Sequence, residues 1–144
     1  MLKNYYLKII FILTLGIFPN LIWAKNSIES ARVWPAREYT RVTLESIKAE
    51  IAKSPEISWE VLAIDDGSTD VSTEVLESWN NQLPLKVFAL NHTGSPATPR
   101  NFGIQQATGD FVFFLDSDDI LLPSGLSAAV NYAIKNDSDV VLPR

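Results

Sequence analysis

The chain alternates short apolar segments of strand length with longer segments of helical periodicity, and this alternation restricts its fold more than any other feature. The segments that we expect to be strands are 60–64, 86–90, 111–115 and 139–142. The segments that we expect to be helices are 40–52, 71–79, 99–108 and 124–136. Strands and helices that alternate in this way form a mostly parallel sheet with helices on both faces. The expected fold class is therefore α/β, with segment 111–115 as the most buried strand.

Acidic residues follow two of the expected strands at the point where each strand ends. Asp65 and Asp66 come directly after the first strand, and Asp116 and Asp118 follow the third. In open parallel sheets, ligands bind in a crevice at the carboxyl ends of the strands. We therefore expect these four carboxylates to lie around one crevice.

The sequence Asp116-Ser117-Asp118 offers two hard oxygen ligands to a divalent cation. Mg²⁺ and Mn²⁺ accept such ligands, and Mg²⁺ typically takes one or two carboxylates together with substrate phosphates. A cation held here would neutralise a departing diphosphate. The pattern alone is weak, because clustered aspartates also cap helices or lie in solvated turns. A calcium loop of the EF-hand type is a poor alternative, since Leu121 stands where that loop needs glycine.

The segment Asp65–Asp70, with the sequence Asp-Asp-Gly-Ser-Thr-Asp, allows two interpretations. In the first it is a turn, in which Gly67 permits a positive φ and Asp70 caps the next helix. In the second, one of its carboxylates accepts the ring N–H of a pyrimidine base. Arg100, at the start of the expected helix 99–108, is similarly either a surface residue or a contact to phosphate or base.

Charge and residue types exclude several classes of function. The net charge is −5 and the sequence has no basic block, so nucleic acid is not an expected partner. The chain has no cysteine, which excludes disulfides and thiolate metal sites. Its single histidine, His92, does not form a histidine metal cluster by itself.

We divide the chain into a signal peptide or membrane anchor at 1–24, a linker or degenerate first strand at 25–39, and a folded domain at 40–144. Lys3 and Lys8 precede an apolar run at 9–18, and Ala24 supplies the small residue found at cleavage sites. A cleaved signal peptide is the first expectation, because the run is short for a membrane span. An uncleaved anchor and a strand or helix of the fold are the alternatives. The first two predict a location at a membrane or in the secretory pathway.

Three motifs, in this order, resemble the family-2 nucleotide-sugar glycosyltransferases with the GT-A fold, which is Rossmann-like. They are Asp-Asp-Gly-Ser-Thr-Asp at 65–70, Pro-Arg-Asn-Phe-Gly-Ile at 99–104 and Ala-Thr-Gly-Asp-Phe-Val-Phe-Phe-Leu-Asp-Ser-Asp-Asp at 107–119. The resemblance extends over 40–142. It implies inverting transfer of a sugar from a nucleoside diphosphate, assisted by Mg²⁺ or Mn²⁺, with a UDP-sugar as the expected donor. The acceptor would be a saccharide or glycan that the sequence does not identify.

The resemblance also implies a role for each matching residue. Asp66 would contact the base, with Asp65 beside it, and Arg100 would help to hold the nucleotide. Asp116 would lie near the ribose and the metal, and Asp118 would be the direct metal ligand.

The sequence departs from the family pattern before the expected helix 40–52. The family's first strand ends in Pro-x-Tyr/Phe-Asn, and Pro35 lies at about the expected distance from Asp65. The preceding segment 30–34 is a weak strand, however, and Arg37 and Glu38 stand at the Tyr/Phe and Asn positions. Glu38 would repel a phosphate.

The residue that deprotonates the acceptor is not identified in this sequence. Family members use a later carboxylate for this step, and the sequence given ends at Arg144 before that region. We therefore expect residues 40–144 to be the nucleotide-sugar-binding half of a truncated glycosyltransferase domain, with no assigned catalytic residue. The alternative is a non-catalytic nucleotide-binding remnant or a truncated gene product without activity.

Overall fold

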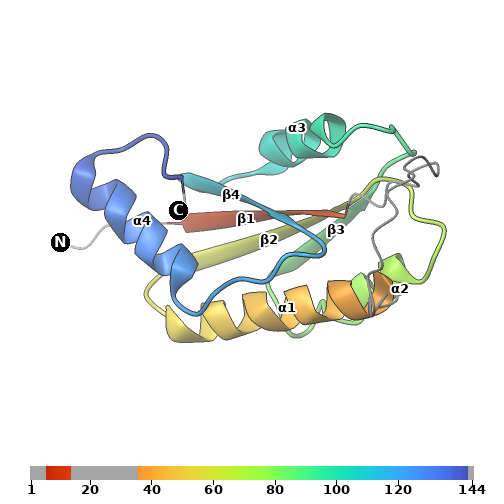
Figure 1. The fold of residues 1–144 in the computed structure, drawn as a ribbon, viewed down its shortest axis with the longest axis horizontal. Helices are drawn as coiled ribbons and strands as arrows, with labels where there is room; N and C mark the ends of the chain where they lie inside the picture. The colour runs from red at the N-terminus through yellow and green to blue at the C-terminus, as the bar shows by residue number, and fades with distance from the viewer. Residues whose placement is uncertain (1–5, 14–35, 143–144) are drawn as a thin grey trace, which may run out of the picture.

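The computed structural model describes residues 6–13 and 36–142, which form a layered α/β structure (Figure 1). Its elements are β1 (Tyr6–Leu13), α1 (Ala36–Lys53), β2 (Ser58–Asp65), α2 (Ser72–Glu77), β3 (Leu85–Ala89), α3 (Ala97–Gln106), β4 (Phe111–Asp116) and α4 (Gly125–Asn136). The strands and helices between 58 and 136 lie within a few residues of their expected positions. The expected α/β class is confirmed.

The four strands form one parallel sheet in the order β3-β2-β1-β4. The chain moves outward from β1 through β2 to β3, and then crosses back to place β4 on the other side of β1. Right-handed crossovers in opposite directions place their helices on opposite faces of a sheet. Accordingly, α1 and α2 lie on one face and α3 on the other (Figure 1).

Two hydrophobic cores cover the two faces of the sheet. The larger core joins the sheet to α1, α2 and α4 through Leu44, Ile47, Val61, Ala63, Leu76, Trp79, Leu83, Leu115, Leu126 and Val130. The smaller core lies on the α3 side, where Leu62 and Ile64 pack with Phe88, Leu90, Phe102 and Ala107. Alternate residues of a strand point to opposite faces, so β2 supplies both cores. This strand is the most buried of the strands whose side chains are described.

The N-terminal apolar segment differs from the first expectation. Tyr6–Leu13 is a strand that pairs along its whole length with β2 and also with β4. The structure therefore gives no support for a signal peptide or membrane anchor at these residues. It agrees with the alternative, a strand of the fold. The physical reason for the ambiguity is that a central parallel strand is a nearly continuous apolar run, as is the core of an export signal.

The remainder of the N-terminal predictions is only partly covered by the described residues. Residues 1–5 and 14–35 lie outside them, so the membrane or secretory location stays a prediction. Residues 36–39 belong to α1 and not to the expected linker, which places positions 37 and 38 in the first turn of a helix. None of the helices within 36–142 is both long and apolar enough to span a lipid bilayer.

Two expectations for the later strands are wrong. β4 is not the most buried strand, because it lies at an edge of the sheet and leaves Val112 and Phe114 about two-fifths exposed. Segment 139–142 does not form a strand, and its Val140 and Leu142 are exposed. An apolar segment becomes a strand only where a neighbouring backbone pairs with it, and among the described residues this segment has no such neighbour.

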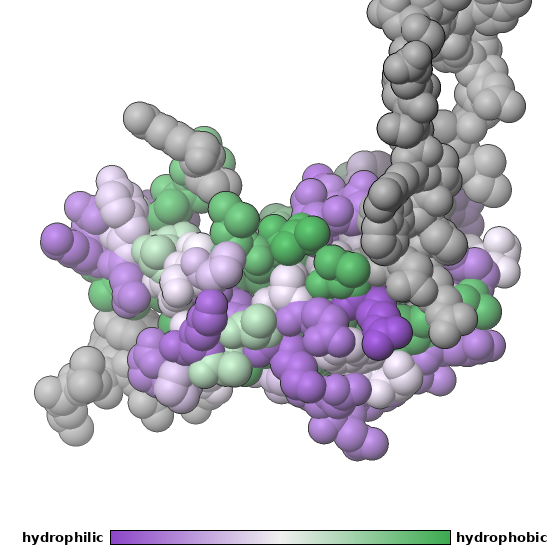
Figure 2. Space-filling view, turned by 60° about the horizontal axis from the view of Figure 1, so that its bottom comes forward, coloured by the Kyte–Doolittle hydropathy of each residue, from purple (hydrophilic) through white to green (hydrophobic). Residues whose placement is uncertain are grey.

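Exposed hydrophobic side chains are also present in the segment after β4. Ile120 and Leu122 are exposed, like Val140 and Leu142 after α4. Figure 2 shows hydrophobic residues gathered across the middle of one face, with hydrophilic residues around them. Neighbouring exposed apolar side chains favour contact with another surface.

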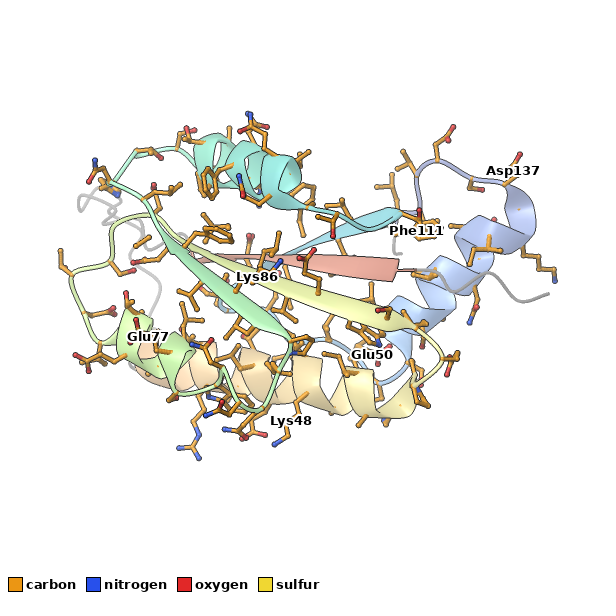
Figure 3. All side chains as sticks on the ribbon, turned by 180° about the vertical axis from the view of Figure 1, so that it is seen from behind. Lys48, Glu50, Glu77, Lys86, Phe111 and Asp137 are labelled. Atoms are coloured by element: carbon orange, nitrogen blue, oxygen red, sulfur yellow. The ribbon has the colours of Figure 1, made fainter. Side chains whose placement is uncertain are left out.

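A buried carboxylate on α1 caps the distant helix α4. Glu50 is 1% exposed, and it lies beside the start of α4 (Figure 3). Its Oε2 accepts a hydrogen bond from the backbone N–H of Ser124 at 2.6 Å, and its Oε1 accepts from the N–H and hydroxyl of Ser127 at 3.0 and 3.1 Å. The first N–H groups of a helix have no partner within the helix. A negative charge at this end also interacts favourably with the helix dipole. Glu50 therefore links the start of α4 to α1 through hydrogen bonds.

We predict that Glu50→Gln lowers the free energy of unfolding by about 1–3 kcal/mol, because an amide N–H₂ would replace one of the acceptors that face the N–H groups of α4. Urea denaturation followed by circular dichroism measures the loss. The matched control is Glu45→Gln on the exposed side of the same helix, which should change stability by less than about 0.5 kcal/mol. Equal stability of the two variants would contradict the capping role.

Candidate functional site

The predicted acidic residues lie at the carboxyl ends of β2 and β4, on one edge of the sheet. β1 runs between these two strands, and its Ile12 is level with both Ile64 and Asp116. Its next residue, Leu13, is level with Asp65. Neighbouring strands are about 4.8 Å apart, so the two acidic strand ends are separated by roughly 10 Å. The structure thus brings the two groups of acidic residues to the end of the sheet where the strands terminate, one group on each side of β1.

Asp65 is buried, and its carboxylate organises the turn that follows β2. It is 2% exposed. Its Oδ1 accepts hydrogen bonds from the backbone N–H and the hydroxyl of Ser68, and its Oδ2 accepts from the hydroxyl of Thr73 at 3.2 Å. These contacts hold the turn against the start of α2. The structure therefore gives Asp65 a role within the fold, beside the residue expected to contact the base.

The turn ends in a helix cap close to the expected one. The carboxylate of Asp70 accepts a hydrogen bond from the N–H of Ser72 at 3.0 Å. The helix boundary itself falls at Val71, one residue later than expected. Asp70 thus satisfies a free N–H at the start of α2, which is the function of a cap.

Asp66 joins the loop after β2 to the loop after β3. Its side chain is 6% exposed, and it contacts Thr93 through both carboxylate oxygens. The N–H of Thr93 donates to Oδ1 and its hydroxyl donates to Oδ2, each at 3.0 Å. The Nδ1 of His92 donates to the backbone carbonyl of Asp66 at 3.0 Å. Sequence reasoning missed Thr93, because a contact between two loops leaves no periodic signal.

Gly67 allows this close contact between the two loops. Its φ is +78°, and a Cβ at this position would lie 2.6 Å from the backbone nitrogen of His92. No side chain fits in that space, and the left-handed backbone itself favours glycine. The sequence interpretation of Gly67 as a turn residue is confirmed by the positive φ, and the approach of His92 adds a second reason for glycine.

Arg100 and Asp116 form an ion pair across the same edge of the sheet. Arg100, in α3, donates from Nη2 to the two oxygens of Asp116 at 3.0 and 3.4 Å. Both side chains are partly exposed, and the guanidinium lies 5.9 Å from the centre of the Phe114 ring. A partly exposed cation beside a carboxylate is a suitable place for the charges of a diphosphate and its counterion. The structure therefore brings together two residues to which the family resemblance gives roles at the nucleotide.

Two hydroxyl side chains of α1 hold the turn after β4 in place. The hydroxyl of Thr43 lies 2.8 Å from the carbonyl oxygen of Ser117 and 2.7 Å from that of Asp119. The hydroxyl of Ser46 accepts a hydrogen bond from the N–H of Leu121 at 3.2 Å. Asp118 is exposed at the outside of this turn. Sequence reasoning also missed Thr43 and Ser46, although polar residues spaced along the buried side of an amphipathic helix were a signal for them.

The described residues do not contain a complete metal site made of side chains alone. In 6–13 and 36–142 no group of three or more histidine, cysteine, aspartate or glutamate residues is placed to hold an ion. Asp116 and Asp118 lie two residues apart at the end of β4, and Mg²⁺ is usually bound through one or two carboxylates together with substrate phosphates. The donor set therefore fits a cation that arrives with a diphosphate.

Residues 33–144 match the model of the family described as "Glycosyl transferase family 2". The chain belongs to this family. The match begins after β1, so the first strand of the sheet lies outside it. The GT-A fold implied by the three sequence motifs is confirmed by solved structures of glycosyltransferases. The structure of Staphylococcus aureus TarS has a TM-score of 0.71 and 29% identity, over 95% of this chain and 21% of that one.

Among curated relatives, this family-2 chain is similar to two poly(ribitol-phosphate) β-N-acetylglucosaminyltransferases of S. aureus. It is 40% identical to TarS of strain Mu50 over 89 residues, which are 61% of this chain and 16% of TarS. It is 32% identical to TarP of strain N315 over 102 residues, which are 69% of this chain and 30% of TarP. The chain thus spans less than a third of the length of either relative.

A more distant solved structure shows the fold alone. The mannosyltransferase PcManGT of Pyrobaculum calidifontis, in complex with GDP-Man and Mn²⁺, has a TM-score of 0.68 and 17% identity, over 91% of this chain and 33% of that one. The fold is therefore shared with a protein of low sequence identity.

We predict that Gly67→Ala lowers the free energy of unfolding more than Gly94→Ala does. Both glycines have a positive φ, so each substitution costs about 1–2 kcal/mol from the backbone alone. A Cβ at Gly94 would meet its nearest atom at 4.0 Å, whereas a Cβ at Gly67 would collide with the backbone of His92. The collision should add about 1–3 kcal/mol.

Urea denaturation of the two variants measures the difference. Equal losses would show that the loop of His92 moves away without cost, and would contradict the close approach of the two loops.

Proposed function

We propose that this chain binds the nucleotide-sugar donor of a family-2 glycosyltransferase, with a UDP-sugar such as UDP-N-acetylglucosamine as the donor. The observation that carries the proposal is the placement of Asp66 and of the Arg100–Asp116 pair at one sheet edge, on either side of β1. A second support is the chemistry of similar proteins. TarS is named for transfer of N-acetylglucosamine, and one solved structure of its residues 1–349 is a complex with UDP-GlcNAc.

The spacing of these groups suits a nucleoside diphosphate. Asp66 would accept the ring N–H of the base at the end of β2. Roughly 10 Å away, Arg100 would pair with a phosphate at the end of β4, where its guanidinium is already partly exposed. Asp65 would support Asp66 through the turn that it organises.

A divalent cation, Mg²⁺ or Mn²⁺, would be held by Asp118 and Asp116 together with the donor's phosphates. When bound, it would offset the negative charge of the departing diphosphate. Asp118 is exposed at the turn after β4, so it is accessible to an ion that arrives with the donor. Thr43 and Ser46 would keep this turn in place through their contacts with its backbone.

Sugar transfer would proceed with inversion, as the family resemblance implies. Inversion requires a base within hydrogen-bond reach of the acceptor hydroxyl. Asp65 is held by contacts with its own turn and with α2, and Asp66 is assigned to the base of the donor. Asp116 is paired with Arg100. We therefore assign the base to none of these residues, and the acceptor stays an unidentified saccharide or glycan.

We predict that the chain binds UDP in the presence of Mn²⁺ and that Asp118→Ala weakens this binding at least ~10-fold, because losing one carboxylate removes a metal ligand. Asp119→Ala is the matched control, since it removes the same charge one residue later and should have little effect. Asp66→Ala should weaken UDP binding and retain its dependence on Mn²⁺.

Isothermal titration calorimetry with and without a chelator measures these affinities. Binding of equal strength in wild type and Asp118→Ala, or binding that a chelator leaves unchanged, would refute the metal-assisted part of the proposal.

We also predict that the chain alone transfers no sugar, because Asp65, Asp66 and Asp116 are held by partners within the fold and Asp118 is assigned to the cation. The assay is release of UDP from UDP-glucose, UDP-N-acetylglucosamine and UDP-galactose with Mn²⁺ and a panel of saccharide acceptors. The double variant Asp116→Ala/Asp118→Ala sets the background. Acceptor-dependent release above that background would show that the 144 residues do contain a base.

A further inference from the structure

We propose that Thr93 positions the carboxylate of Asp66 and thereby determines which base the site accepts. This inference rests on the proposed binding of a nucleoside diphosphate. It adds to that proposal a residue outside the three sequence motifs, and it names the discrimination that this residue produces, which is uridine over cytidine.

The geometry of the contact supports a positioning role. A single residue supplies two donors, its backbone N–H and its hydroxyl, to the two different oxygens of Asp66, each at 3.0 Å. Two such bonds fix the rotation of the carboxylate plane, which one bond would leave free. Hydrogen bonds to a charged acceptor are also stronger than those between neutral groups.

Thr93 is itself held in place by the loop before it. His92 donates from Nδ1 to the backbone carbonyl of Asp66, and its backbone approaches Gly67 so closely that no Cβ would fit. The hydroxyl of Thr93 has a second acceptor, the carbonyl oxygen of Ser95 at 3.2 Å. The carboxylate oxygen is nearer and charged, so the hydroxyl proton favours Asp66.

The remaining hydrogen-bonding capacity of Asp66 leads to base discrimination. A carboxylate has about four acceptor positions. Thr93 fills one on each oxygen, and the Nδ1 of His92 lies 3.6 Å from Oδ2, so Oδ1 is the less crowded oxygen. An oriented carboxylate with free positions accepts the ring N3–H of uracil. Cytosine has no hydrogen on N3, so its ring nitrogen would face the carboxylate as a second acceptor. A site built around a hydrogen bond rejects an analogue that lacks the matching donor.

The neighbouring carboxylate provides a matched comparison. Asp65 also accepts a hydrogen bond from a threonine hydroxyl, that of Thr73 at 3.2 Å, but it is 2% exposed and serves its own turn. Thr73→Val therefore removes the same chemical group from the adjacent aspartate. It should lower stability without changing the preference for one base over another.

The test measures the dissociation constants of UDP and CDP, with Mn²⁺, for the full chain and for three variants. For wild type we expect tighter binding of UDP. Thr93→Val should weaken UDP binding about five-fold, the effect of one hydrogen bond, and leave CDP binding nearly unchanged. Thr93→Ser, which keeps the hydroxyl, should restore the preference, and Thr73→Val should keep the wild-type ratio.

Each outcome decides the inference. An unchanged UDP-to-CDP ratio in Thr93→Val, or an equal loss for both nucleotides, would overturn it while leaving donor binding intact. A wild-type chain that binds neither nucleotide would overturn the proposed function itself, and this inference with it. Thr93 is exposed, so the valine variant should fold, and Thr93→Ala removes the same hydroxyl if it does not.

Discussion

The pairing of β1 with two neighbours is the constraint on which the rest of the structure depends. β2 and β4 carry the acidic residues, and they do not pair with each other, so β1 sets both their distance and their relative height. Through it, Asp116 comes level with Ile64, one residue before Asp65. The helices then follow from the direction of each crossover, which places α3 with its Arg100 on one face and α1 on the other.

Helix α1 serves two purposes through two rows of side chains. Leu44 and Ile47 pack into the larger core, as the periodicity of the sequence predicted. A second row, Thr43, Ser46 and Glu50, binds the backbone of the turn after β4 and the start of α4. The turn that carries Asp118 therefore depends on contacts from α1. Thr43 and Glu50 are tolerated at buried positions because each one has a backbone partner.

The sequence was sufficient to predict the fold class, the helices, and the placement of the acidic strand ends at one end of the sheet, because these follow from periodicity and from the topology of parallel sheets. Local turn chemistry was also predictable, as Gly67 and Asp70 show. Other features were not. The apolar segment 6–13 has a composition that suits an export signal and a central strand equally well. The exposure of β4 depends on its neighbours, and the contact between Asp66 and Thr93 joins loops that are distant in sequence.

The position of β1 in the chain has a consequence for folding during synthesis. β1 is synthesised before the other strands of this sheet. Because Leu7 pairs with Phe111, about 100 further residues must be synthesised before its second neighbour exists. At ~5–20 residues per second, this is a delay of roughly 5–20 s. Pairings between distant segments are slow to form in any case. During this interval β1 can pair with β2 alone, and the side that later pairs with β4 stays open. An open strand edge is a place where other extended segments can pair.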